Sequence, residues 1–193
     1  MINEKMLISA KQSIAVGVLE TNSIPRGIKA IDEMLKMAEI TIIESCPICP
    51  GKYLNIFSGS LSFVKVAIDK GVEVAETFLV DKVIIPAIDK SVLPSLMRAN
   101  PLKTIDSVGI IEIHAMATAL EVADTVVKSG NVTLVEVRLA KCLGGKSFVS
   151  FTGDIGSVRS AAKTGEDLAR SRGQLLHSVV IPKPHSKLHS FLG

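Results

Sequence analysis

The sequence predicts an α/β chain, of the α+β kind, in which one small domain occurs twice in tandem. Short motifs of the first half recur in the same order in the second half, beginning with VGVLE at 16–20 and VGIIE at 108–112. Each half also alternates Val- and Ile-rich stretches, typical of strands, with apolar residues at helical spacing. The matched pairs that follow are Asp32 with Asp124, Lys36 with Lys128, Glu44 with Glu136, Gly51 with Gly145, Phe57 with Phe151, Gly71 with Gly165 and Pro86 with Pro182.

The first copy predicts the element order strand, helix, strand, strand, helix, strand. Ser23 can cap the first helix, Pro25 suits its first turn, and Lys36 lies at its C-terminal end, where a cation suits the helix dipole. The expected elements are a strand at 14–20, a helix with apolar residues Ile28, Ile31, Met34, Leu35 and Ala38, strands at 40–45 and 53–58, a helix at about 61–77 and a strand at 83–86.

The second copy repeats this order, which is that of the ferredoxin-like, split βαβ fold. Lys128 again lies at the end of the first helix. Because this fold serves many functions, it assigns none by itself. A trimer of such a chain would present six like domains, a pseudo-hexamer. The expected strands are 107–113, 132–139, 147–152 and 177–181, and the second helix is 155–171.

Three segments are expected along the chain: an N-terminal extension at 1–13, a first domain at 14–100 and a second at 101–193. Of the 193 residues, 47% are apolar, which is ample for a core. The net charge of +3, with no Trp and one Tyr, is too mild for a nucleic-acid partner. No apolar run approaches the roughly 18 residues of a membrane span, and an odd count of three cysteines favours reduced thiols in the cytoplasm.

The copies differ most in one loop, which reads SCPICPGK in the first and VRLAKCLGGK in the second. Cys46 and Cys49 resemble the Cys-Pro-x-Cys pair of glutaredoxins, but a strand-like YLNIF follows where a thiol-activating helix should begin. Zinc would need more paired ligands. Cys142 has no second cysteine near it in the sequence. The histidines do not have the spacing that metal ligands usually show; they are His114, His177, His185 and His189.

The segment GGKS at 144–147 offers only the tail of a P-loop, since Ala140 replaces the first glycine and a strand follows. A glycine turn between two strands is the better interpretation. No catalytic set is evident, so the sequence predicts no enzyme. An iron–sulfur cluster usually takes four cysteine thiolates. Three chains whose loops converge on a threefold axis could supply three, and one iron would then carry a non-protein ligand.

The chain resembles the tandem-domain, trimer-forming shell proteins of bacterial microcompartments over nearly all of 14–189. The motifs are VGVLE and VGIIE, then MLKMAEI and VVKSGNV at the ends of the first helices, and VVIPKPH near the C-terminus. Within that family, ICPGKY (48–53) and LGGK (143–146) are most similar to the subtype of propanediol-utilisation compartments, whose central pore holds a 4Fe–4S cluster.

This resemblance implies that Cys49, one from each of three subunits, binds one 4Fe–4S cluster per trimer. Cys46 is extra, because the family usually has another residue there, so it is a bystander or a competing ligand. The implied pore-loop residues are Pro50, Gly51, Lys52, Gly144 and Gly145.

Lys36 and Lys128 match the family's edge lysine, where neighbouring tiles meet. Taken alone, each is better interpreted as a solvated lysine at a helix end, but the repetition and the family match favour the edge role. The family's Pro-Arg-Pro-His is Pro182-Lys183-Pro184-His185 here, so Lys183 takes the place of an edge arginine. Lysine keeps the charge and loses the planar fork. Residues 1–13 precede the family's core and have no assigned role.

The sequence therefore predicts a trimeric, pseudo-hexameric shell tile in the cytoplasm, with other shell proteins and an encapsulated or cytosolic redox protein as partners. Its special role would be electron transfer across the shell. Two alternatives remain: a metal-free tile whose pore passes a small metabolite, and a small-ligand regulatory protein of ferredoxin-like fold.

Overall fold

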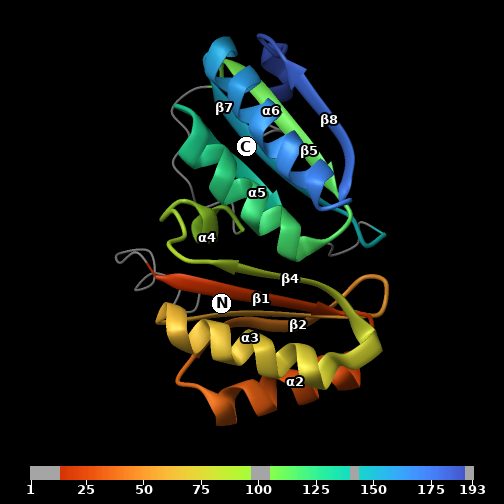
Figure 1. Cartoon of the computed structure of the whole chain (residues 1–193). Coiled ribbons are helices and arrows are strands. Elements are labelled where there is room, and N and C mark those ends of the chain that lie inside the picture. The colour runs from red at the N-terminus through yellow and green to blue at the C-terminus, as the bar shows by residue number, and fades with distance from the viewer. Residues whose placement is uncertain (1–13, 97–104, 140–143, 190–193) are drawn as a thin grey trace. The chain divides into compact units, whose positions relative to one another are not determined.

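The computed structural model describes two compact units (Figure 1). Among the described residues, the first unit holds 14–90 together with 115–117 and 144–145, and the second unit holds the others. The expected N-terminal extension at 1–13 and Cys142 lie outside the described residues. The described residues are 14–96, 105–139 and 144–189.

The first repeat has four strands and two long helices. A 3₁₀ turn, η1 (Glu76–Phe78), joins the second long helix to the last strand. The strands form one antiparallel sheet in the order β2-β3-β1-β4. Its elements are β1 (Ala15–Thr21), α2 (Ile24–Met37), β2 (Thr41–Ile48), β3 (Lys52–Gly59), α3 (Leu61–Ala75) and β4 (Leu79–Ile85).

The second repeat forms a second antiparallel sheet, in the order β6-β7-β5-β8. A short helix, α4 (Val92–Ser95), precedes it, and a 3₁₀ turn, η2 (Ser186–Leu188), follows it. Its elements are β5 (Ser107–Ile113), α5 (Met116–Ser129), β6 (Thr133–Arg138), β7 (Ser147–Gly153), α6 (Ile155–Ser171) and β8 (Leu175–Ile181).

Both repeats therefore have the predicted order of elements and the same order of strands, so the predicted fold class is confirmed. In the first unit, α2 and α3 lie on the same side of the sheet (Figure 1). The core between the helices and the sheet is built around Leu19 and Phe57 of the strands. Ile31 and Met34 of α2 and Ile68 of α3 pack against them, as their helical spacing predicts.

One close contact is repeated in both sheets. A Cβ placed on Gly17 would lie 2.4 Å from the ring of Phe57, and a Cβ on Gly109 would lie 2.4 Å from the ring of Phe151. Glycine is required at both positions because the aromatic ring of the neighbouring strand occupies that space. The duplication therefore preserves packing as well as element order.

Side chains cap three of the helix starts, and of these caps the one at Ser23 was predicted. The side chain of Ser23 accepts a hydrogen bond from the Arg26 N–H at the start of α2. Ser60 does the same at α3 and Asp154 at α6. Each side chain satisfies one N–H that has no partner within the helix.

Three predicted strand boundaries, the end of β2 and the starts of β4 and β8, were wrong. Strand β2 was expected to end at residue 45 but runs through Pro47 to Ile48, because β2 is an edge strand, where a missing N–H is tolerated. The last strands were expected to begin at 83 and 177 but begin at Leu79 and Leu175. No helix in the described part of the chain is long and apolar enough to cross a membrane.

Candidate functional site

The first predicted site residue, Cys49, lies at the tip of the β2–β3 hairpin. Ile48 and Lys52 are the last paired residues of the two strands, which leaves Cys49, Pro50 and Gly51 as the turn. Cys49 and Pro50 are exposed, and the peptide bond between them is cis. Gly51 has a φ of +70°, a left-handed conformation that favours glycine. The turn therefore presents the Cys49 thiol at an open tip.

Cys46 occupies a different environment. It lies within β2, opposite Leu54 of β3, and is half-buried. A strand residue cannot turn towards the tip without breaking the ladder of backbone hydrogen bonds. The two cysteines that are close in sequence therefore belong to a strand and to a turn.

No group of three or more His, Cys, Asp or Glu side chains that could hold a metal ion occurs among the described residues. The described part of the chain therefore offers Cys49 as a single exposed thiol ligand. A cluster at this turn would need thiolates from further copies of the chain.

An ion pair anchors the base of the Cys49 turn. The Lys52 ammonium lies 2.8 Å from Oε1 of Glu20, which is fully buried on β1. A buried carboxylate is tolerated only with such partners. Lys52, predicted as a pore-loop residue, therefore holds the hairpin to the sheet, and its side chain is only 18% exposed.

The sequence interpretation missed this ion pair, although a signal for it was present. Both members recur in the second copy as Glu112 and Lys146. There the ammonium lies 3.4 Å from the carboxylate, and the side chain of Glu112 is 39% exposed. The repeated pair ties β1 to the start of β3 and β5 to the start of β7.

In the second copy, the described part of the corresponding turn consists of Gly144 and Gly145, which match Pro50 and Gly51. Gly144 has a φ of +61° and Gly145 a φ of +87°, so both require the left-handed conformation. Gly145 and Pro50 belong to the same compact unit, and a Cβ on Gly145 would lie 2.7 Å from Cδ of Pro50. The structure therefore brings together two of the predicted pore-loop residues, Pro50 and Gly145.

The two predicted edge lysines have the same local partner. Lys36 lies 2.6 Å from Asp32, four residues earlier on α2, and also pairs with Glu33. Lys128 lies 2.7 Å from Asp124, four residues earlier on α5. Hydrogen bonds to Asp32 and then Glu33 raise the pKa of Lys36 above its ordinary value. Both lysines are thus held by an aspartate of their own helix.

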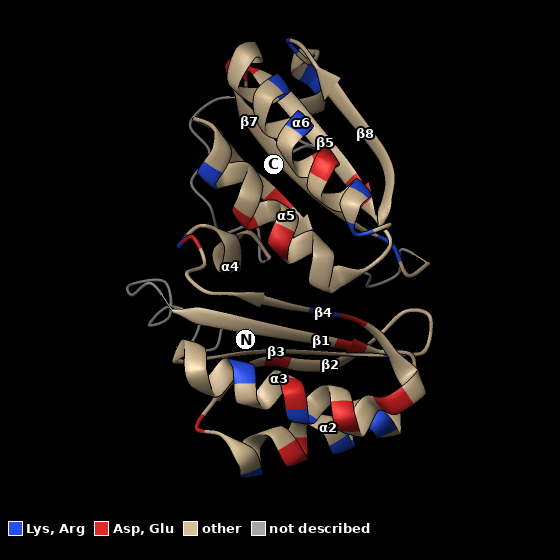
Figure 2. Cartoon of the chain, viewed as in Figure 1, with Lys and Arg blue, Asp and Glu red and all other residues tan. Residues whose placement is uncertain are grey.

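Lys183, the third predicted edge residue, is exposed in the turn that follows β8. It has a positive φ of 48°, while the neighbouring Pro184 is buried. His185 accepts a hydrogen bond from the Lys187 N–H through Nδ1, which begins the following 3₁₀ turn. Figure 2 shows that Lys and Arg residues are interspersed with Asp and Glu residues along the helices.

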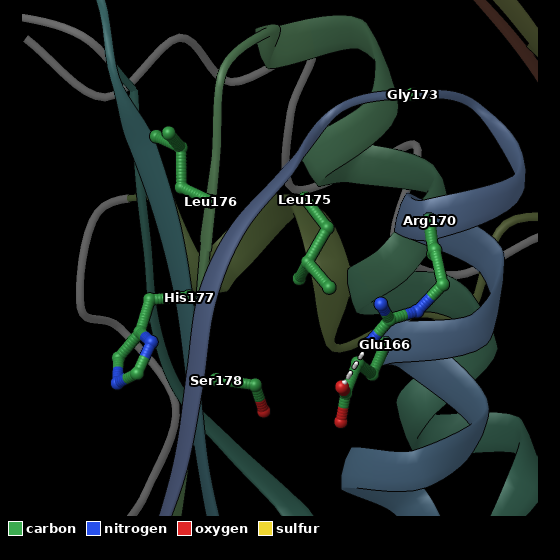
Figure 3. Close-up of a pocket in the computed structure, with 7 residues that line it drawn as sticks. All are labelled: Glu166, Arg170, Gly173, Leu175, Leu176, His177 and Ser178. Carbon is green, nitrogen blue, oxygen red and sulfur yellow. Dashed lines mark hydrogen bonds and ion pairs between the residues drawn. The ribbon is translucent and has the colours of Figure 1, made fainter.

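A pocket of about 440 Å³ lies in the second unit, between the C-terminal end of α6 and the start of β8 (Figure 3). Arg170 and Glu166 of α6 line it and form an ion pair of 2.6 Å. Residues 175–178 of β8 line the other side. None of the predicted site residues lies in this pocket.

Comparisons with known proteins find relatives that match over most of the chain. The BMC domain matches it twice, at residues 15–88 and 107–184. The bacterial microcompartment shell protein PduT of Citrobacter freundii is 39% identical over 176 residues, which are 91% of this chain and 96% of that protein. A microcompartment protein from Desulfitobacterium hafniense DCB has a solved structure with a TM-score of 0.81 at 42% identity, covering 92% of this chain and 99% of that chain. The fused permuted hexameric shell protein MSM0275 shares the fold, with a TM-score of 0.61 at 19% identity over 82% of each chain.

Proposed function

The chain belongs to the BMC-domain family and is a structural shell protein of a bacterial microcompartment rather than an enzyme, and we propose that three copies form a tile with a 4Fe–4S cluster at its centre. The regulatory-protein alternative is set aside, because the relatives are shell proteins. The observation that carries the proposal is the exposed Cys49 thiol at the tip of a glycine-containing turn.

The residues present fit such a cluster if three copies of the chain are related by threefold symmetry. Each chain contributes Cys49, so three copies around an axis supply three thiolates, and one iron takes a non-protein ligand. A bound cluster would supply one-electron transfer. This chain's own residues hold the ligand: Gly51 forms the turn, and the ion pair of Lys52 with Glu20 fixes the base of the hairpin.

Cys49 is preferred to Cys46 for a geometric reason. A cluster on an axis needs thiolates that reach beyond the surface of each subunit. Cys49 is exposed on a turn, whereas Cys46 is half-buried in the paired region of β2. The environment of Cys49 therefore suits a shared ligand, and that of Cys46 suits a packing residue.

The matched pair of serine variants tests this assignment in anaerobically purified protein. Cys49→Ser removes three ligands from each trimer and should abolish bound iron, while the trimer mass is kept. Cys46→Ser, the control, should keep most of the iron. Iron and acid-labile sulfide analysis with molar mass from light scattering measures both properties. Full iron retention in Cys49→Ser would overturn the cluster proposal and leave the metal-free metabolite tile.

The proposed tile meets other shell proteins through its edges. Lys36 and Lys128 support this role because both occupy the end of the first helix in their repeat and both pair with an aspartate four residues earlier. Lys183 adds a third exposed cation, in the turn after β8. A redox protein inside or outside the compartment would exchange electrons with the cluster.

A further inference from the structure

The helices of the first repeat carry an exposed apolar patch. Its members are Met37 at the end of α2 and Phe63 and Val66 in the first two turns of α3, and they are 58%, 42% and 43% exposed. Phe63 and Val66 are three residues apart, so they lie on the same side of α3. We call these three side chains the α2–α3 patch.

The two helices that carry the patch lie side by side (Figure 1). A Cβ on Gly59, which precedes α3, would lie 3.3 Å from the carbonyl oxygen of Glu39, which follows α2. A Cβ on Gly71, late in α3, would lie 2.6 Å from the sulfur of Met34, three residues earlier than Met37 on α2. The helices therefore run antiparallel, and the patch lies where α2 ends and α3 begins.

Charged residues border the patch on one side. Lys70 of α3 has a raised pKa, caused first by its hydrogen bond to Glu73 and also by the charge of Glu33 on α2. Met37 lies one helical turn after Glu33, and Val66 lies one turn before Lys70, so antiparallel packing brings Met37 beside Val66. The apolar side chains of the two helices therefore form one continuous surface.

The second repeat has serine at all three matching positions. The α2–α3 patch matches Ser129, Ser157 and Ser160 at the offsets of the duplication. Ser129 and Ser160 are exposed, and Ser157 is half-buried. Both repeats form the same helices, so the fold does not require apolar residues at these places. An apolar surface that the first repeat alone carries indicates a partner that reaches only the first repeat.

The chain that precedes β1 enters the first repeat beside this patch. Ala15, the first residue of β1, pairs with Gly59, and α3 begins two residues later at Leu61. Residues 1–13 are therefore joined to the sheet at the end where the α2–α3 patch lies. The second repeat has no such segment attached to its first strand, because its chain arrives there from the first repeat.

This preceding segment has suitable side chains and sufficient length. Met6, Leu7 and Ile8 are consecutive apolar residues. Ile8 is seven residues from Ala15, and a chain of that length reaches up to about 25 Å. Val66 lies five residues beyond the start of α3, which is about 8 Å along the helix axis. The apolar run can therefore reach the whole patch.

We propose that Met6, Leu7 and Ile8 bind the α2–α3 patch of their own chain and cover the apolar surface that the first repeat leaves open. Removal of apolar side chains from water drives this contact. A segment of the same chain meets the patch at a high effective concentration, which favours it over a separate protein. The proposal concerns a single chain and is independent of the cluster and of the trimeric tile.

A single tryptophan tests whether the segment covers the patch. The chain has no Trp, so Phe63→Trp introduces a unique fluorophore, and Ser157→Trp is the matched control in the second repeat. In the full chain, Phe63→Trp should emit at a shorter wavelength than Ser157→Trp and should be quenched less by acrylamide. Replacing Met6, Leu7 and Ile8 with serine should shift the emission of Phe63→Trp to that of the control and leave the control unchanged.

Two results of this experiment would overturn the proposal. An exposed emission of Phe63→Trp in the chain with its native residues 1–13 would show that the patch is open. A short-wavelength emission that survives the three serine substitutions would show that another surface, such as a second copy of the chain, covers the patch. Circular dichroism verifies that each variant is folded.

A disulfide tests the contact directly. In a chain with its native cysteines replaced by serine, Leu7→Cys together with Val66→Cys should form a disulfide on air oxidation, and the product should keep the mass of one chain. Leu7→Cys together with Ser160→Cys, the control, should keep both thiols free. A disulfide-linked dimer would mean that the segment binds a second copy, and equal oxidation of the two pairs would mean that it has no preferred site. Either result would refute the contact.

Discussion

The two hairpin turns, β2–β3 and the one that leads into β7, occupy the same place in their repeats and differ at the tip. Both are anchored by a lysine that pairs with a glutamate of the first strand of its repeat, Glu20 or Glu112. In the first turn Pro50 and Gly51 follow Cys49, whereas the matching described residues of the second turn are Gly144 and Gly145. The duplication has kept the ion pair at the base of the turn, while Gly144 stands where the first copy has Pro50.

A second difference concerns the surfaces around these turns. The carboxylate of Glu20 is buried, while that of Glu112 remains partly exposed in the single chain. The same sequence pattern is therefore buried in one repeat and partly exposed in the other.

The largest expected effect concerns the lysine at the C-terminal end of the first helix, which both repeats share. Replacing Lys36 and Lys128 together with aspartate should abolish sheets of tiles, because it puts a negative charge at every edge where a lysine now lies. Electron microscopy of assembled sheets measures this, and light scattering should still give the trimer mass. The matched control replaces Lys29 and Lys65, two exposed lysines of α2 and α3, with aspartate and should leave tiling intact. Normal sheets from the Lys36 and Lys128 variant would mean that these lysines are merely solvated.

A smaller effect should separate the two glutamates. Glu20→Ala leaves the mostly buried ammonium of Lys52 without its counter-ion, and should lower the free energy of unfolding by about 3 kcal/mol. Glu112→Ala breaks an exposed pair and should cost less than about 1 kcal/mol. Urea denaturation of both variants makes the comparison.

A double variant provides the control for Glu20. Replacing Glu20 with leucine and Lys52 with methionine removes both charges, so most of the lost stability should return. Equal losses from Glu20→Ala and Glu112→Ala would show that the difference in burial has no energetic consequence.

The smallest expected effect distinguishes the caps of the second helices, which are Ser60 at α3 and Asp154 at α6. The hydroxyl of Ser157, and next its backbone N–H, lower the pKa of Asp154 below its ordinary value of 3.8. This contribution to stability is therefore present above pH 3.8 and is lost as the pH falls through the lower pKa of the folded state. Ser60 has no such dependence, because its hydroxyl does not titrate.

Asp154→Ser should accordingly weaken the acid dependence of the melting temperature below pH 4, with a small loss at neutral pH. Asp69→Ser, an exposed aspartate within α3, is the control. An unchanged acid profile in Asp154→Ser would contradict the role assigned to this cap.

Much of the fold was predictable because the duplication gives two sequences for each helix and strand. The order of elements, the cap at Ser23 and the turn at Cys49 follow from local sequence, since capping and turn residues act on their own neighbourhood. The strand ends near Pro47 and Leu79 were not predictable, because both strands lie at sheet edges and their ends depend on pairing with β3 and β1.

The ion pair of Glu20 with Lys52 was missed for a related reason. The two residues lie far apart in the sequence and meet only through the pairing of β1 with β3. Likewise, the exposure of Ile28 or Val179 cannot be read from the sequence, in which each looks like an ordinary core residue. The cross-strand register and the burial of a side chain are properties of the folded chain.

The central claim is that three copies of the Cys49 turn hold one cluster. Iron and sulfide analysis of the anaerobic wild-type trimer, with its EPR spectrum before and after one-electron reduction, tests this most directly. The predicted result is about four iron atoms for every three chains and a signal that changes with one electron. A trimer without iron after anaerobic purification and reconstitution, or iron in proportion to one cluster per chain, would contradict it.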